Sequence, residues 1–185
     1  MKKILLLTFF LFGLLGYSQK KVSIYNFSSF PLKIYNVRTK PTTLTFPYYT
    51  GYSVGLYPLE SAILENLGST TKFPFYSPVI TPTVYNSTSF NWTKYPAAGA
   101  PTISTGLTLW NTTAGNTQVL GSISYNVGSI NGGGIGGSLT IPIPPTGLNM
   151  TYHYQTTTWQ VDYERVYLNL PSLTNYEDVI IFSDL

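Results

Sequence analysis

The chain of 185 residues contains no cysteine, and this absence excludes several kinds of chemistry. Without thiols there is no disulfide framework, no thiolate zinc site, no cysteine nucleophile and no lipid-anchored cysteine. Charged residues are also scarce, at 9% of the sequence, whereas aromatic residues reach 16%. Disordered chains show the opposite balance. Because one domain typically has about 150 residues, we expect a single folded domain.

Histidine is nearly as scarce, because His153 is the only one. A Ser-His-Asp triad would have to use His153 with Asp162, but the chain lacks a Gly-x-Ser-x-Gly nucleophile motif. Asp162 and Glu164 are spaced like a glycosidase pair, yet exposed strands often carry acids at alternate positions. One histidine and no cysteine leave few metal ligands. The sequence therefore predicts a non-enzymatic protein with no metal or other cofactor.

Glycines 132, 134 and 137 match the pattern Gly-x-Gly-x-x-Gly. A dinucleotide-binding site needs a helix directly after this pattern to hold the pyrophosphate. Residues 138–143 instead include β-branched side chains and end among prolines, so they do not favour the required helix. We interpret the segment as a flexible hairpin tip.

Residues 1–18 have the three parts of a secretory signal peptide. Two lysines follow Met1, residues 4–15 are mainly apolar, and small residues precede Gln19. A membrane-spanning helix needs about 20 apolar residues, more than this run contains. We predict cleavage before Gln19, which leaves residues 19–185 as one domain. The leader resembles those of exported proteins of the Bacteroidota, in which cleavage just before a glutamine is common.

The pI of about 9.0 reflects the leader in part, because cleavage leaves eight basic residues against seven acidic ones. A nearly neutral chain with few cations is a poor nucleic-acid binder. The charges are unevenly placed, and we expect the two ends of the mature chain to lie side by side and neutralise each other. The early cations are Lys20, Lys21, Lys33, Arg38 and Lys40, and the late acids are Asp162, Glu164, Glu177, Asp178 and Asp184.

Apolar and polar residues alternate along much of the chain, whereas helical spacing is almost absent. This pattern is typical of strands with one buried face. We predict an all-β fold, an antiparallel β-sandwich, with a small closed β-barrel as the alternative. Residues 58–67 would form a strand or, alternatively, a helical turn. The expected strands are residues 22–27, 32–37, 52–56, 62–64, 89–94, 106–110, 117–127, 138–143, 150–154, 156–170 and 179–182.

The segment 156–170 changes its pattern partway along. Trp159, Val161 and Tyr163 share one parity, but the apolar residues after Arg165 have the opposite parity. A β-bulge shifts parity by one residue, so we predict a bulge near Glu164 and Arg165. The alternative is a strand that is buried on both faces beyond this point.

Aromatic residues surround three prolines in residues 73–85. Proline lacks the amide donor that a sheet needs, so this segment is either an exposed aromatic loop or a plug that closes the sandwich. Exposed aromatic and amide side chains bind sugars and protein surfaces. We expect Trp110 and Trp159 to be mostly buried. The predicted binding residues are Phe73, Phe75, Tyr76, Tyr85 and Trp92.

These features predict an exported binding or interaction module that engages an envelope protein or a glycan through aromatic-rich loops. One alternative is an accessory subunit that docks on or caps an outer-membrane protein machine, and here the resemblance of the leader implies a machine in the style of the type 9 secretion translocon. A second alternative is a small eight-stranded outer-membrane barrel. We expect a periplasmic, outer-membrane-associated or extracellular location.

Overall fold

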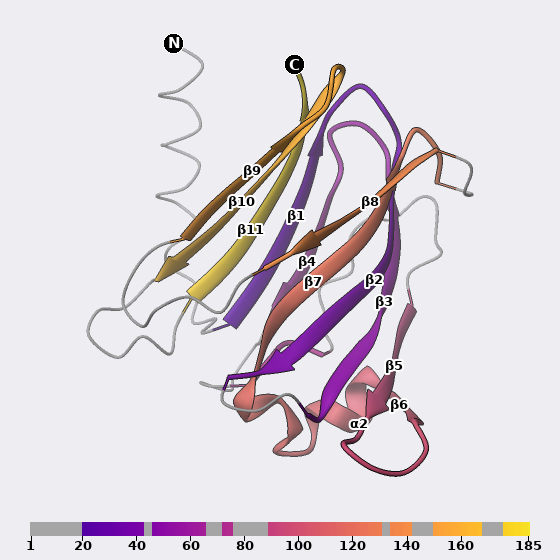
Figure 1. Cartoon of the computed structure of the whole chain (residues 1–185), viewed down its shortest axis with the longest axis vertical. Coiled ribbons are helices and arrows are strands. Elements are labelled where there is room, and N and C mark those ends of the chain that lie inside the picture. Colours follow the sequence, from indigo (N-terminus) through magenta and orange to yellow (C-terminus); the bar gives the residue numbers. More distant parts are fainter. Residues whose placement is uncertain are drawn as a thin grey trace.

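The computed structural model describes residues 20–42, 46–65, 72–75, 89–130, 134–141, 150–167 and 176–185. Within these ranges, eleven strands form two sheets (Figure 1). The predicted signal peptide lies outside the described residues.

The first sheet has five strands in the order β4-β1-β11-β10-β9. Their bounds are Ser61–Glu65 for β4, Lys20–Phe27 for β1, Tyr176–Asp184 for β11, Trp159–Tyr167 for β10 and Met150–Gln155 for β9. The second sheet has six strands in the order β6-β5-β3-β2-β7-β8. Their bounds are Thr102–Thr105 for β6, Ser89–Tyr95 for β5, Tyr48–Leu56 for β3, Leu32–Pro41 for β2, Gln118–Val127 for β7 and Ile135–Thr140 for β8.

Among the described residues, both sheets are open and antiparallel except for the pair β1 and β11, which is parallel. The predicted antiparallel sandwich is therefore confirmed over the closed alternative. The inner faces meet in a shared core. There the ring of Tyr125 on β7 packs edge to face against Trp159 on β10 and Phe182 on β11, with centroids 5.7 and 5.0 Å away. Trp159 is buried, as predicted.

The first and last strands of the described chain, β1 and β11, lie side by side in the five-stranded sheet (Figure 1). Lys21 on β1 lies opposite Glu177 on β11, and its Nζ is 3.2 Å from the Glu177 carboxylate. The same carboxylate accepts a hydrogen bond from the Ser23 hydroxyl. The ion pair confirms the prediction that the basic N-terminal segment and the acidic C-terminal segment of the mature chain lie side by side.

Residues 106–110 are not the predicted strand. Gly106–Trp110 is one turn of helix, α2, which follows β6 directly. The hydroxyl of Thr105 accepts a hydrogen bond from the Thr108 amide, and this N-terminal cap favours the helical turn over an extended chain. By contrast, β4 confirms the strand that was expected within residues 58–67.

The predicted β-bulge in β10 is also absent. From Trp159 to Tyr167 the strand keeps an unbroken register with β11, and with β9 over the part that pairs. The buried side continues from Tyr163 to Arg165. The parity change in the sequence therefore reflects a buried arginine in a regular strand, not an inserted residue.

Within the described residues, no helix has the length and apolar character required to span a membrane.

Candidate functional site

Three of the five predicted binding residues belong to the core. Phe73, Phe75 and Trp92 are 1%, 0% and 0% exposed. Tyr76 and Tyr85 lie outside the described residues, as does the side chain of Trp110. Of the two alternatives for this segment, an exposed loop and a plug, the structure shows the plug for the rings of Phe73 and Phe75.

Trp92 holds this plug in place. Its ring packs edge to face against Phe73 and Phe75, with centroids 6.0 and 5.1 Å away, and its indole Nε1 donates a 2.8 Å hydrogen bond to the Phe75 carbonyl. Since the indole donor and the ring are both used internally, Trp92 offers no surface for a ligand. The prediction that Trp92 binds a partner is corrected on this ground.

An exposed feature instead lies on the outer face of the six-stranded sheet. We call it the aromatic row and define it as Arg38, Phe46, Tyr48 and Tyr95. Tyr48 and Tyr95 are directly opposite each other on β3 and β5, and their rings stack at 4.8 Å with an angle of 10° between planes. The guanidinium of Arg38 lies 4.0 Å from the centre of the Tyr48 ring. Phe46 extends the row at 5.5 Å from Tyr48.

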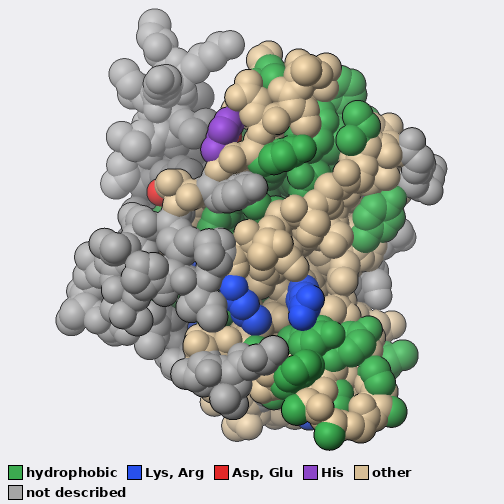
Figure 2. All heavy atoms as spheres, viewed as in Figure 1, with side chains coloured by type: hydrophobic (Ala, Val, Ile, Leu, Met, Phe, Trp, Pro, Cys, Tyr) green, Lys and Arg blue, Asp and Glu red, His purple; other side chains and the backbone are tan. Residues whose placement is uncertain are grey.

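The neighbouring cross-strand line completes this face. Arg38 lies opposite Thr50, Thr50 opposite Thr93, and Thr93 opposite Ile103 on the edge strand β6. Residues that pair directly across strands project from the same face of a sheet. Ile103 is 77% exposed. The face therefore combines aromatic rings, a cation, hydroxyls and one prominent aliphatic side chain. In Figure 2, hydrophobic side chains gather over the lower ends of β2, β3, β5 and β6.

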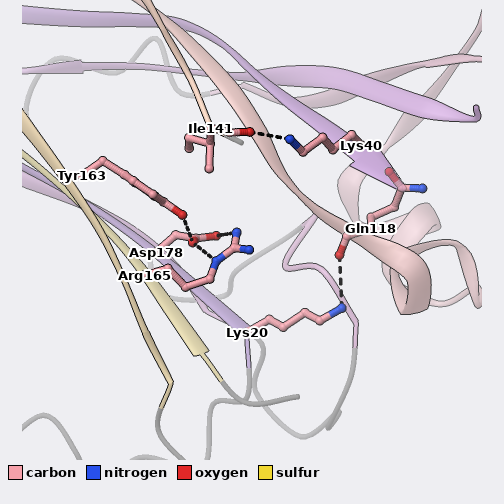
Figure 3. Close-up of polar contacts among 7 residues, drawn as sticks. All are labelled: Lys20, Lys40, Gln118, Ile141, Tyr163, Arg165 and Asp178. Atoms are coloured by element: carbon pink, nitrogen blue, oxygen red, sulfur yellow. Dashed lines mark hydrogen bonds and ion pairs between the residues drawn. The ribbon is translucent and has the colours of Figure 1, made fainter. Parts of the chain in front are cut away.

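A second group of polar side chains lies between the sheets and is drawn in Figure 3. We call it the inter-sheet charge cluster and define it as Lys20, Lys40, Arg165 and Asp178. Arg165 donates from Nε and Nη2 to the two carboxylate oxygens of Asp178, at 2.6 and 3.0 Å. The Tyr163 hydroxyl donates a third hydrogen bond to Asp178, at 2.8 Å. Three donors converge on this carboxylate, as its ionised form requires.

The two lysines of the cluster reach backbone oxygens on the six-stranded side. Lys20 extends from β1 across the interior and donates to the carbonyls of Asn116 and Gln118, at 3.2 and 3.1 Å. Lys40 on β2 donates to the carbonyl of Ile141. Figure 3 shows the Lys20 ammonium directed at Gln118 and the Lys40 ammonium directed at Ile141.

Burial shifts the pKa values in the cluster. Burial and the nearby Arg165 charge lower the pKa of Lys20 to about 8, although Asp178 opposes the shift. Burial and the same Arg165 charge also lower the pKa of Lys40. Burial raises the pKa of Asp178, against the opposing influence of Arg165, Tyr163 and Lys20. The cluster is thus electrostatically coupled across both sheets.

His153 and Asp162 do meet, on neighbouring strands β9 and β10. The Nδ1 atom of His153 is 2.5 Å from an Asp162 oxygen, and this hydrogen bond is the main cause of a raised His153 pKa. The other ring nitrogen faces Gln155 at 3.4 Å rather than a serine. The described residues also contain no group of three or more His, Asp or Glu side chains able to hold a metal ion.

Sequence reasoning missed both the row and the cluster. The sequence does contain a signal for the cluster, because alternate residues of a strand face the same side. By this rule Arg165 shares the side of Trp159, and Asp178 shares the side of Ile180. For the row, no local signal exists, because Tyr48 and Tyr95 become neighbours only through strand pairing.

No family model matches the chain, and no curated protein or solved structure is significantly similar to it.

Proposed function

We propose that the protein is an exported, non-enzymatic binding module that engages another envelope protein through the outer face of its six-stranded sheet. The observation that carries this proposal is the stacked aromatic row on that face.

The row is ordered before any partner arrives. Tyr48 is held by Tyr95 and Arg38, so these side chains have little rotamer freedom left to lose on binding. Ordering a flexible side chain at an interface costs about 0.5–1.5 kcal/mol. Tyrosine and arginine are also enriched among the residues that dominate protein interfaces. A rigid row of these residues is therefore well suited to protein recognition.

The stacking geometry favours a protein over a sugar as the partner. A sugar ring needs a free aromatic face, but the Tyr95 ring and the Arg38 guanidinium already pack against the Tyr48 ring. With Arg38 and the exposed Ile103 on the same face, the surface presents hydrogen-bond donors together with an apolar contact.

A photo-activated cross-linking amino acid at position 103 tests the proposal in cells that produce the chain. We expect it to capture one envelope protein, whereas the same group at position 135, on the opposite edge strand, captures none. The double variant Tyr48→Ala/Tyr95→Ala should abolish the cross-link without lowering the melting temperature by more than a few degrees. Tyr154→Ala, an exposed tyrosine on the other sheet, is the matched control.

Capture from position 103 that persists in the double variant would contradict the proposal. Binding to a glycan array that Tyr48→Ala/Tyr95→Ala abolishes, with no protein captured, would assign the face to a sugar instead.

A further inference from the structure

Charged residues are divided unequally between the two sheets. The strands of the six-stranded sheet contain no Asp or Glu. The segments outside the described ranges contain none either, so the chain has no further acidic side chain to place on this sheet. Glu60 precedes β4 and accepts a hydrogen bond from the Tyr57 amide. The other acids all lie on strands of the five-stranded sheet, as Glu65, Asp162, Glu164, Glu177, Asp178 and Asp184.

The six-stranded sheet does carry cations, and one of them is exposed. Its strands contain Lys33, Arg38, Lys40 and Lys94. Among these four described side chains, only Arg38 is exposed, since Lys33 is buried and the other two lysines are half-buried. The contact of Arg38 with the Tyr48 ring is a cation–π contact, which uses none of the five N–H donors of the guanidinium. Arg38 therefore presents a positive charge and unused donors on the outer face.

The cross-strand neighbours of Arg38 are neutral. Arg38 lies opposite Ser122 on β7, and Ser122 lies opposite Thr140 on the edge strand β8. In the other direction, the line runs through the threonines of β3 and β5 to Ile103. Residues that pair directly across strands share a face. One line across all six strands thus has a single positive charge near its middle and hydroxyl groups on both sides.

A single supported arginine fits a protein carboxylate better than it fits an anionic polymer. Anionic lipid surfaces are recognised by clusters of about four to eight Lys and Arg residues, and nucleic acids also require several cations. A guanidinium, by contrast, binds one carboxylate with two parallel hydrogen bonds. The Tyr48 ring already holds the Arg38 guanidinium in place, which lowers the entropic cost of forming such a pair.

We propose that the protein partner of the outer face presents an Asp or Glu side chain to Arg38, so that the interface is built on an acidic surface of the partner. This inference rests on the proposed function and adds the chemistry of the partner to it. The six-stranded sheet supplies the cation without any acid that would compete for it. The carboxylate therefore has to come from the partner.

Charge reversal at Arg38 tests the proposal in the full chain, with the cross-linking group at position 103 and the cells that produce the protein. Arg38→Glu should lower the yield of the cross-link on the order of tenfold or more, because two carboxylates would then face each other. Lys94→Glu makes the same change in charge. Lys94 alternates with Thr93 and Tyr95 along β5 and so lies on the other face of the sheet. This control should capture the partner as the unmodified chain does.

Two further substitutions separate the charge of Arg38 from its packing. Arg38→Met keeps an apolar chain that packs on Tyr48 but has no charge, and it should also reduce capture. Arg38→Lys keeps the charge without the two-pronged geometry, so its yield should fall between those of Arg38→Met and the unmodified chain. Mass spectrometry of the adduct then identifies the acidic residue of the partner nearest to the cross-link. Changing that residue to Arg should restore capture by Arg38→Glu.

The outcomes distinguish this inference from the proposed function. Capture that survives both Arg38→Glu and Arg38→Met, but is lost in Tyr48→Ala/Tyr95→Ala, overturns the acidic partner and leaves the docking face standing. No capture from position 103 by the unmodified chain overturns both. Capture of a second copy of this chain assigns the face to self-association and overturns both as well. If Arg38→Glu does not fold, Arg38→Met and the residue mapped in the adduct decide the question.

Discussion

At the scale of single residues, the buried pair of Arg165 and Asp178 is the least expected feature. Removing two charges from water costs several kcal/mol for each ion, and only good geometry offsets that cost. Here both carboxylate oxygens receive hydrogen bonds from Arg165, Tyr163 adds a third, and the Tyr176 ring covers the guanidinium. The two residues lie directly opposite each other on β10 and β11. A register slip by one residue would turn one of them outward, so the pair also specifies the register.

Asp178→Asn should destabilise the protein by about 3–5 kcal/mol, because it leaves the Arg165 charge buried without a counter-ion. Asp162→Asn is the control, since that carboxylate forms an ion pair at the surface, where such pairs contribute little. Urea denaturation at neutral pH measures both. Equal stabilities of the two variants would show that the buried pair does not hold the sheet together.

At the scale of elements, β3 and β5 approach each other closely where Trp92 enters the core. A Cβ atom on Gly51 would lie 2.3 Å from the Asn91 carbonyl oxygen and 2.8 Å from the Trp92 ring. Real Cβ atoms do not come this near to such neighbours. Glycine at position 51 thus allows Trp92 to pack closely against β3, where its ring contacts the plug formed by Phe73 and Phe75.

Gly51→Ala should therefore cost about 1–3 kcal/mol through overpacking, and the aromatic plug should loosen with it. Gly136→Ala on the edge strand β8 is a matched control, because a Cβ there meets nothing closer than the Tyr125 carbonyl oxygen at 3.8 Å. Thermal unfolding followed by tryptophan fluorescence reports both effects. A Gly51→Ala protein as stable as Gly136→Ala would mean that the two strands separate at no cost.

At the scale of the whole molecule, the fold joins its two ends. Strand β11 lies between β1 and β10 and pairs with both, so the five-stranded sheet is incomplete until the last ten residues are present. The strand also supplies Asp178, Ile180 and Phe182 to the interior. Folding of this sheet therefore requires contact between residues far apart in the sequence, which is entropically costly to form.

A chain that ends at Asn175 should fail to unfold cooperatively, because β1 and β10 lose their shared neighbour and the core loses Phe182. A chain that lacks only Leu185, which is 56% exposed, should melt close to the full-length temperature. Near-ultraviolet circular dichroism during heating distinguishes the two. A sharp transition in the shorter chain would contradict the role assigned to β11.

The amino-acid sequence by itself determined the all-β class, because alternation of apolar and polar residues depends only on which side of a strand each residue faces. It also determined that the basic start and the acidic end would meet, since opposite charges in a nearly neutral chain attract. Most strand positions followed from local pattern. Gly106–Trp110 did not, because a single capping hydroxyl at Thr105 outweighs a weak strand pattern over five residues.

Only the tertiary structure decided which polar and aromatic residues are inside. Trp92 and Phe75 share the composition of a binding loop, but the close approach that Gly51 permits places them in the core. Tyr48 and Tyr95 form a surface feature solely because β3 and β5 pair in one register. Arg165 is buried because Asp178 reaches it from the next strand. In each case the deciding contact joins distant parts of the chain, and local sequence patterns do not record such contacts.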